Sequence, residues 1–331
     1  MILREMSASW GATDGPWFMS RWGRENCIVS ARSRHCEYPL FQQRLSIKAV
    51  WGGREDCFVD GRRVTLDDDT FIILNEGRIY ASRLHSRSPV STFSIFFRPG
   101  MAEEVLGAMQ SNAEQALEHP DVKAGVPVEF SEAARRHDRQ ITPVLNYIRH
   151  HVDYGLAEEP WYEEQLRFLL QRMLVAHQED LRKADLIPAA RAATRKELFR
   201  RVGLGADFIN THFSEGIVLD DIAAASRLSP YHCLRIFKVV YGRTPNAYLT
   251  QKRVQVAERL LRNSSAQIDE VAANVGFRSR TTLFRQMRQF RGLSPSTIRR
   301  RGEHALPGDA DDSRRERRES ARPAVAEWLT T

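Results

Sequence analysis

The most informative segment of the chain is DDIAAASRLSPYHCLRIFK, residues 220–238, because a similar segment occurs later in the sequence. Residues 269–288 read DEVAANVGFRSRTTLFRQMR, so the acidic pair, the two alanines and an end with one apolar and one basic residue recur, with one extra residue in the turn. Each copy is followed by a Gly-x-Ser/Thr-Pro stop, at residues 242–245 and 292–295. Such an internal repeat predicts two copies of one supersecondary unit.

Each copy has the pattern of a helix-turn-helix. A short helix opens at the acidic pair, where the helix dipole favours negative charge, and a turn containing Gly276 follows in the second copy. Ser229 before Pro230, and Ser279 in the second copy, are residue types that cap and open the next helix. The apolar pattern of residues 246–262 predicts a longer helix. This helix would hold the two helix-turn-helix units at a fixed separation.

Helical spacing sorts the second helix of each unit into an inner and an outer face. The inner face is expected to hold Leu234 and Phe237, then Phe284 and Met287. The N-terminal outer residues of such a helix reach base edges in the major groove, and an arginine fork can bond guanine O6 and N7 together. The predicted base contacts are Tyr231, Arg235, Arg280, Thr281 and Arg285. Phosphate contacts position the protein without specifying sequence, and the predicted ones are Ser229, His232, Lys238, Ser279 and Arg288.

The charge distribution favours a polyanionic partner for the C-terminal part. The formal net charge is +7, and residues 201–300 carry 16 Lys and Arg against 7 Asp and Glu, which leaves −2 for the rest. A basic half predicts double-stranded DNA as partner. A solvated basic face without a ligand would have the same charge.

The N-terminal half has the pattern of short strands. Over residues 40–98 apolar residues alternate with polar ones, and Asp60-Gly61 separates two strand-like runs, which predicts a tight hairpin. Strands at this spacing indicate a sandwich or a small barrel. Beyond residue 100 the spacing becomes helical, over residues 101–118, 131–151 and 161–181. The predicted fold class is α+β.

At the repeat the chain resembles the AraC/XylS family of bacterial transcription regulators. The segments that carry the resemblance are residues 221–238, 242–249, 271–277 and 292–295. The resemblance implies a seven-helix domain that binds promoter DNA through the five outer-face residues named above. It also implies a regulator, most often an activator that contacts RNA polymerase. Cys233, Met287 and Arg288 replace residues usual in the family, so the operator sequence is not predictable from it.

The N-terminal half is similar to the cupin-type sensor domain of many such regulators, which implies a small β-barrel that binds a small effector or mediates dimerisation. The segments that carry this similarity are residues 64–77 and 97–100. The expected domains are a sensor and dimerisation domain, a linker, a DNA-binding domain and a disordered tail with little to bury, at residues 1–185, 186–200, 201–301 and 302–331.

Two other classes of protein compete with a regulator. One is a cupin metalloenzyme with a DNA-binding appendage, but the strand region has only His35 and His85, and the neighbours His150 and His151 point about 100° apart on a helix. Nucleophile elbows and Gly-rich phosphate loops are absent from the sequence. We therefore expect no catalytic residue, metal or cofactor. The other is a non-specific architectural DNA protein, which differs by its lack of sequence preference.

Assembly and location are predicted from weaker signals. The apolar stripe of residues 161–181 could form a dimer seam or pack on its own barrel, and a homodimer is favoured because pairing raises affinity for DNA. Trp17, Trp22 and Trp51 are expected in the core rather than in an effector pocket. The charged start, the four scattered cysteines and the lack of an apolar run of roughly 18 residues predict a cytoplasmic protein with no membrane partner.

Overall fold

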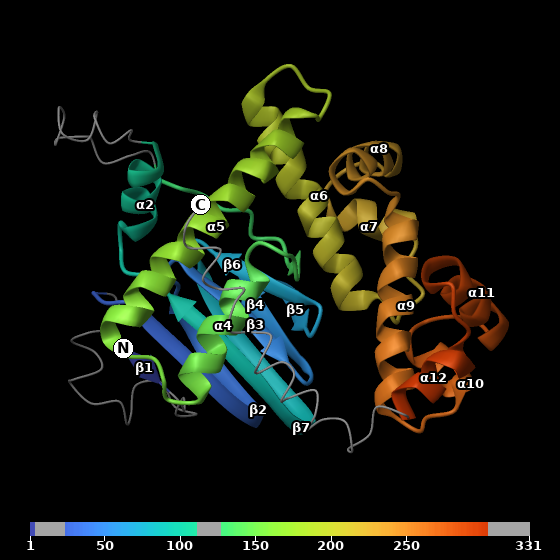
Figure 1. The fold of residues 1–331 in the computed structure, drawn as a ribbon. Coiled ribbons are helices and arrows are strands. Elements are labelled where there is room, and N and C mark those ends of the chain that lie inside the picture. The colour runs from blue at the N-terminus through green and yellow to red at the C-terminus, as the bar shows by residue number, and fades with distance from the viewer. Residues whose placement is uncertain (4–23, 111–126, 304–331) are drawn as a thin grey trace. The chain divides into compact units, whose positions relative to one another are not determined.

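The computed structural model describes residues 1–3, 24–110 and 127–303, which pack as two compact units. The first unit comprises Met1–Thr211 with Leu219–Pro245, and the second comprises His212–Val218 with the residues from Asn246 onward. Figure 1 follows the chain from the blue strands to the last helix in red. The predicted tail, residues 302–331, lies almost entirely outside the described residues.

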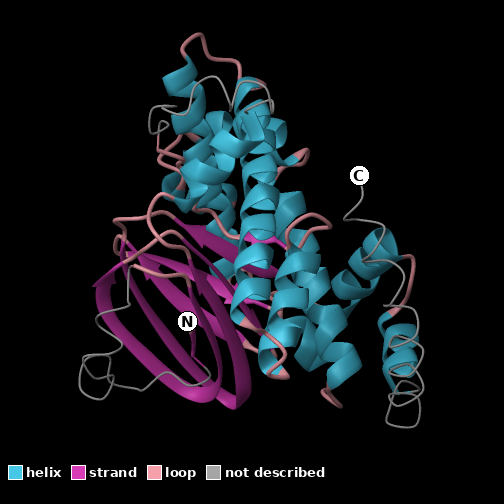
Figure 2. Ribbon diagram, turned by 60° about the vertical axis from the view of Figure 1, so that its left-hand side comes forward, coloured by secondary structure: helices cyan, strands magenta, loops and turns pink. Residues whose placement is uncertain are grey.

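The first unit is built on a sheet of eight strands (magenta in Figure 2). They are β1 (Ile2–Leu3), β2 (Cys27–Gln42), β3 (Ser46–Trp51), β4 (Arg54–Val59), β5 (Arg62–Asp67), β6 (Thr70–Leu74), β7 (Ile79–Phe96) and β8 (Arg135–Arg136). The hydrogen-bonded order is β1-β2-β7-β3-β6-β8, and β4 pairs with both β5 and β7. β1 pairs with β2 in parallel, and the other pairs are antiparallel.

The hairpin between β4 and β5 confirms the predicted Asp-Gly turn. Asp60 has φ 49° and Gly61 has φ 77°, so both turn residues are left-handed. This geometry matches the twist of the flanking strands, and Asp and Gly accept it at low cost. Val59 therefore lies opposite Arg62 in the ladder.

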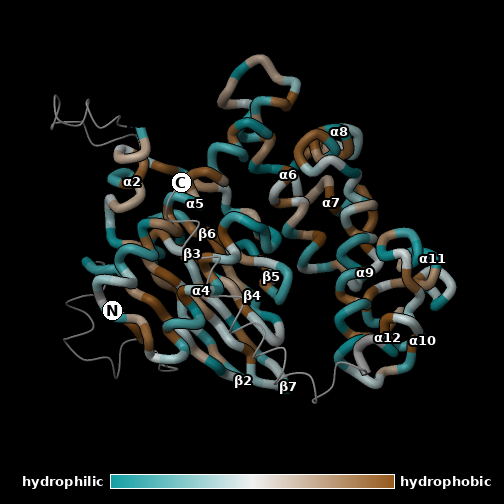
Figure 3. The backbone as a smooth tube through the Cα atoms, in the orientation of Figure 1, coloured by the Kyte–Doolittle hydropathy of each residue, from teal (hydrophilic) through white to brown (hydrophobic). Residues whose placement is uncertain are grey.

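The central strands are buried on both faces. Ile47 and Phe71 belong to a cluster that includes residues of α2 (Met101–Gln110), α4 (Thr142–Asp153) and α5 (Glu159–Asp185). Val50 and Ile72, which point to the other face, belong to a second cluster with residues of β4 and β5. Burial on both sides explains the unbroken apolar run of β6, which is brown in Figure 3. The α+β class is confirmed, and the sheet is consistent with the predicted cupin-like barrel.

The apolar stripe of α5 packs on the chain's own sheet. Its members are at most 1% exposed and lie in the cluster under the helices: Leu166, Leu169, Leu170, Met173 and Leu174. The stripe is therefore not a dimer seam, and a dimer has to use another surface. Trp51 packs against the same cluster, as predicted, with the Arg149 guanidinium 4.0 Å from its ring centroid.

One predicted helix is wrong over part of its length. Residues 131–141 are not helical, and within them β8 pairs with β6. The Asp138 carboxylate accepts hydrogen bonds from the backbone N–H groups of Gln140 and Ile141, at 2.9 and 2.7 Å, and Pro143 follows in the first turn of α4. A side chain that satisfies free N–H groups, followed by proline, starts a helix at this point rather than ten residues earlier.

The remaining helices carry the repeat. Except for its last residue, α6 (Ala192–His212) belongs to the first compact unit, as do α7 (Leu219–Ala225) and α8 (Pro230–Tyr241). Except for its first residue, α9 (Pro245–Asn263) belongs to the second compact unit, as do α10 (Ile268–Asn274), α11 (Arg280–Arg291) and α12 (Pro295–Glu303). α6 begins inside the segment predicted as a linker, so residues 192–200 are helical. Within the described ranges, no helix is both long and apolar enough to cross a bilayer.

Candidate nucleic-acid interface

The second helices of the two repeats, α8 and α11, begin and end by the same local rules. The Ser229 hydroxyl accepts a hydrogen bond from the His232 N–H at 3.4 Å, and the Ser279 hydroxyl accepts one from the Thr282 N–H at 3.2 Å. Both helices end at a left-handed glycine, with φ 68° and 69° in the two copies. These caps satisfy backbone groups that a helix terminus leaves without partners. Both helices therefore begin after the predicted serines and end before the predicted glycines.

The turn inside each helix-turn-helix unit needs one residue with a left-handed backbone conformation. In the first unit this residue is Arg227, with φ 53°, and in the second it is Gly276, with φ 82°. A Cβ at Gly276 would lie 2.7 Å from the backbone oxygen of Ser214, which belongs to the same compact unit. Only glycine fits this position without movement of the neighbouring backbone.

The inner faces differ from the prediction by one position. Cys233, Ile236 and Phe237 are buried in the first unit, and Leu283 and Met287 in the second. Leu234 and Phe284, which were expected in the core, are only half-buried. In each helix the residue one position earlier is buried instead: Cys233 in the first copy and Leu283 in the second. The burial of Phe237 and Met287 was predicted correctly.

The predicted base-contact residues are exposed side chains at the N-terminal part of α8 and α11. Tyr231, on α8, is 75% exposed, and the others are exposed as well: Arg235, Arg280, Thr281 and Arg285. Tyr231 and Arg235 are four residues apart, as are Thr281 and Arg285, so each pair shares one face of its helix. Arg280 has an ion pair of 3.8 Å with Asp269. Both partners are largely exposed, so this contact is weak.

The predicted phosphate-contact residues are also at the surface, except for one. Lys238 and Arg288 are exposed, and His232 is half-buried. Ser229 and Ser279 are exposed, and their oxygen atoms already accept the capping bonds. The Ser279 hydroxyl also shares a hydrogen bond with the Thr282 hydroxyl, at 3.1 Å.

Charged residues that the sequence did not indicate connect the elements of the second compact unit. Glu258 of α9 binds Arg291, at the end of α11, at 2.6 Å, and Arg262 at 2.7 Å. Arg253 donates to the backbone oxygens of Phe213 and Glu215 at 2.7 and 2.6 Å. The Glu258–Arg262 pair is visible as an i,i+4 spacing. The other contacts join distant parts of the chain, so no spacing reveals them.

Two features of the first unit bear on an effector or a metal. The Nδ1 atoms of His35 and His85 lie 3.2 Å apart across β2 and β7. No group of three or more potential metal ligands occurs among the residues that the structure describes. A cavity of 290 Å³ lies beside the start of α2, and its lining includes Asn75, Arg78 and Glu129. Trp17 and Trp22 lie outside the described residues.

Two capped helix-turn-helix units with exposed basic side chains on their second helices define the class of helix-turn-helix DNA-binding proteins. Residues 222–301 match the family model described as "Helix-turn-helix domain". The chain is 32% identical over 94 residues to the uncharacterized HTH-type transcriptional regulator YdeC of Bacillus subtilis, covering 28% of this chain and 32% of that protein. It is 24% identical over 220 residues to YbfI of the same organism, covering 66% and 73%.

A solved structure gives a further match. The DNA-binding domain of AdpA in complex with a target DNA is 30% identical, covers 32% of this chain and 96% of that one, and has a TM-score of 0.31. The alignment with YdeC spans about a third of that relative's length. The chain contains a helix-turn-helix domain and is related to HTH-type transcriptional regulators, as the sequence predicted.

Proposed function

We propose that this chain is a transcription regulator that binds promoter DNA sequence-specifically, with α8 and α11 each inserted into a major groove. The proposed base contacts are Tyr231, Arg235, Arg280, Thr281 and Arg285. The observation that carries the proposal is the recurrence of exposed side chains at the same two positions, four residues apart, in two similarly capped helices. A solvated basic surface has no reason to repeat this arrangement.

The proposed phosphate contacts flank these positions. Lys238 and Arg288 lie one turn further along their helices and are exposed. His232 and the hydroxyl groups of Ser229 and Ser279 lie at the helix N-termini, where the dipole attracts phosphate. Such contacts hold the helices in register and carry the salt dependence of binding.

For the rest of the chain we propose a division of labour. The sheet-containing part, residues 1–185, would take up a small effector, pair with a second copy, or do both. Residues 201–301 would bind DNA, joined through residues 186–200. Bound in this way, the protein would act in the cytoplasm on promoter DNA, with RNA polymerase as partner and activation as its usual outcome. No enzymatic activity is proposed.

Competition binding tests the proposal. Promoter fragments are selected by the purified full chain and then compared with random DNA at several stated salt concentrations. We expect a preference of about 10³-fold or more for the selected sequence. Arg235→Ala and Arg285→Ala should each lower affinity for it by about 10-fold or more. Arg87→Ala, an equal change of charge at an exposed position of β7, is the control and should have no such effect.

A non-specific architectural protein would give another result. All fragments would then compete equally, and affinity would fall steeply with salt for every one of them. That outcome would overturn the proposal.

A further inference from the structure

α6 carries a carboxylate that is buried against the sheet. Asp207 is 1% exposed, and it forms an ion pair with Arg62 of β5. Its other oxygen accepts a hydrogen bond from the Ala134 N–H at 2.7 Å. Burial raises the pKa of the Asp207 carboxyl, and Arg62 and the Ala134 N–H oppose this rise. A buried charge with two well-placed partners holds its segment in one geometry, because loss of either partner leaves it uncompensated.

One face of α6 contacts the sheet and the segment around Ala133. Gly203, Asp207 and Thr211 follow each other at intervals of four residues and are all buried. A Cβ at Gly203 would lie 3.0 Å from the Ala133 Cβ, so the chain passes closely here. The Thr211 hydroxyl accepts a hydrogen bond from the backbone N–H of Thr65 in β5, at 3.3 Å.

The other side of α6 supports the first helix-turn-helix unit. Gly205 is two residues from Gly203, so the two point to nearly opposite sides of the helix. A Cβ at Gly205 would lie 2.3 Å from the Ser226 hydroxyl oxygen and 3.3 Å from a methyl carbon of Ile222, at α7. Arg201 donates to the backbone oxygen of Arg227 at 3.3 Å. α6 is thus clamped between the sheet and α7.

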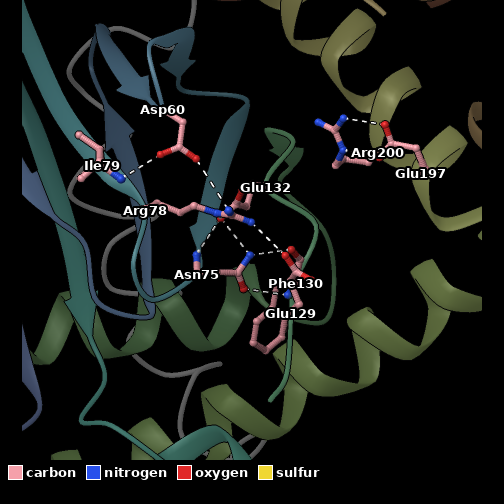
Figure 4. A network of polar contacts seen from close by, with 9 residues as sticks. All are labelled: Asp60, Asn75, Arg78, Ile79, Glu129, Phe130, Glu132, Glu197 and Arg200. Atoms are coloured by element: carbon pink, nitrogen blue, oxygen red, sulfur yellow. Dashed lines mark hydrogen bonds and ion pairs between the residues drawn. The ribbon is translucent and has the colours of Figure 1, made fainter. Parts of the chain in front are cut away.

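The segment that supplies Ala134 is itself tied to the sheet. Glu132 accepts hydrogen bonds from the Arg78 guanidinium at 2.8 Å and from the Asn75 side chain at 2.9 Å (Figure 4). Asn75 also exchanges two hydrogen bonds with the backbone of Phe130, and the Glu132 backbone oxygen accepts one from Arg62 at 3.1 Å. This network fixes both partners of Asp207 on the sheet side.

We propose that Asp207 is a positioning residue for DNA recognition: through Arg62 and the Ala134 N–H it fixes α6, and with it α7 and α8, relative to the sheet. The proposal rests on the proposed function, since it concerns the DNA contacts of α8. The second helix-turn-helix unit belongs to the other compact unit. We call the contacts of Asp207 with Arg62 and with the Ala134 N–H the clamp. Loss of the clamp therefore impairs base recognition by Tyr231 and Arg235 and leaves base recognition by Thr281 and Arg285 unchanged.

The test is a double-mutant cycle on the full chain. Bases whose preference is lost in Arg235→Ala define the first subsite, and those lost in Arg285→Ala define the second. Asp207→Asn and Arg62→Met should each weaken discrimination at the first subsite about 10-fold, as expected for residues of one network, and leave the second unchanged. In the Arg235→Ala background, the same two substitutions should lower discrimination at the first subsite little further. In the Arg285→Ala background, they should lower it by the full factor of about 10.

A role in stability alone would give a different pattern. Asp207→Asn would then lower binding at both subsites equally, in step with the fraction of unfolded protein, and that result would overturn the proposal. Arg62→Lys, which keeps the charge, should retain most of the discrimination that Arg62→Met loses. If Asp207→Asn does not fold, the two Arg62 variants decide the question alone, because the Arg62 side chain is 26% exposed.

A distance measurement provides a readout without DNA. Spin labels are placed on cysteines introduced at the exposed positions Arg87 in β7 and Ala224 in α7, since the four native cysteines are buried. We expect a narrow distance distribution in the parent chain and a broad one in Asp207→Asn and Arg62→Met. Equal widths in all three would overturn the proposal. If the parent shows no DNA preference but the widths differ, the proposed function fails while the clamp stands.

Discussion

Replacing Gly276 by alanine should destabilise the second helix-turn-helix unit far more than the same change at another left-handed glycine. Gly276 has φ 82°, and a Cβ there would lie 2.7 Å from the backbone oxygen and 2.9 Å from the backbone carbon of Ser214. Gly292, in the same unit, has φ 69° and open space around a Cβ. It is therefore a matched control that carries the backbone cost without the clash.

The size of the effect follows from two contributions. A non-glycine residue in the left-handed region costs about 1 kcal/mol, and both variants bear this cost. Overpacking against backbone that has to move costs about 1–3 kcal/mol more, and only Gly276→Ala bears it. We expect a loss of about 2–4 kcal/mol in the free energy of unfolding for Gly276→Ala, and of about 1 kcal/mol for Gly292→Ala.

Hydrogen exchange measured by mass spectrometry on the full chain resolves this difference, because peptides from α10 and α11 report on the second unit separately. Protection of these peptides should fall about 5-fold in Gly292→Ala and roughly 30-fold or more in Gly276→Ala. Peptides from the sheet should keep their protection in both variants. Equal losses in the two variants would contradict this prediction, because the contact with Ser214 would then carry no energy.

Three further predictions concern the turn of the first unit, its pH dependence and the DNA contacts. Arg227→Gly should stabilise the first unit by about 0.5–1 kcal/mol, seen as a higher midpoint in chemical denaturation, because φ 53° strains a non-glycine residue. Burial lowers the pKa of His137 and His177 in the folded state. The unfolded chain therefore takes up protons first, and the unfolding free energy should decrease as the pH falls below about 6.5, less so in the double His→Gln variant. Lys238→Ala should weaken binding to all sequences alike and lower the slope of log affinity against log salt by about one.

Each of these predictions has a result that contradicts it. A lower midpoint for Arg227→Gly would mean that the arginine side chain contributes more than the backbone strain costs. An unchanged pH dependence in the double histidine variant would show that other groups govern it. A base-specific loss in Lys238→Ala would assign that residue to readout rather than to phosphate.

The repeat was predictable because its signals are local. Serine caps, acidic first turns and terminal glycines act within a few residues, and α8 and α11 begin directly after Ser229 and Ser279, as expected. The exposure of the outer face followed from helical spacing alone. The choice between neighbouring core positions, such as Cys233 and Leu234, depends on how the first helix of each unit packs. Spacing by itself does not determine it.

The clamp on α6 was not predictable for the opposite reason. Asp207 lies 145 residues from Arg62 in the chain, and an acidic residue in a helical pattern is ordinarily assigned to the solvent-exposed face. Its burial results from the packing of α6 on the sheet. Residues 131–141 were misassigned partly for a related reason, since β6 and α6, which contact them, are far away in sequence. The local signals of the later helix start, Asp138 and Pro143, were overlooked.

We propose that the two helix-turn-helix units each contact their own group of base pairs. A base-by-base preference profile of the full chain, with Arg235→Ala and with Arg285→Ala on the selected promoter site, tests this. We expect each variant to lose preference at a different group of adjacent base pairs, with the two groups about one helical turn of DNA apart. Loss at the same base pairs in both variants, or at none in either, would contradict it.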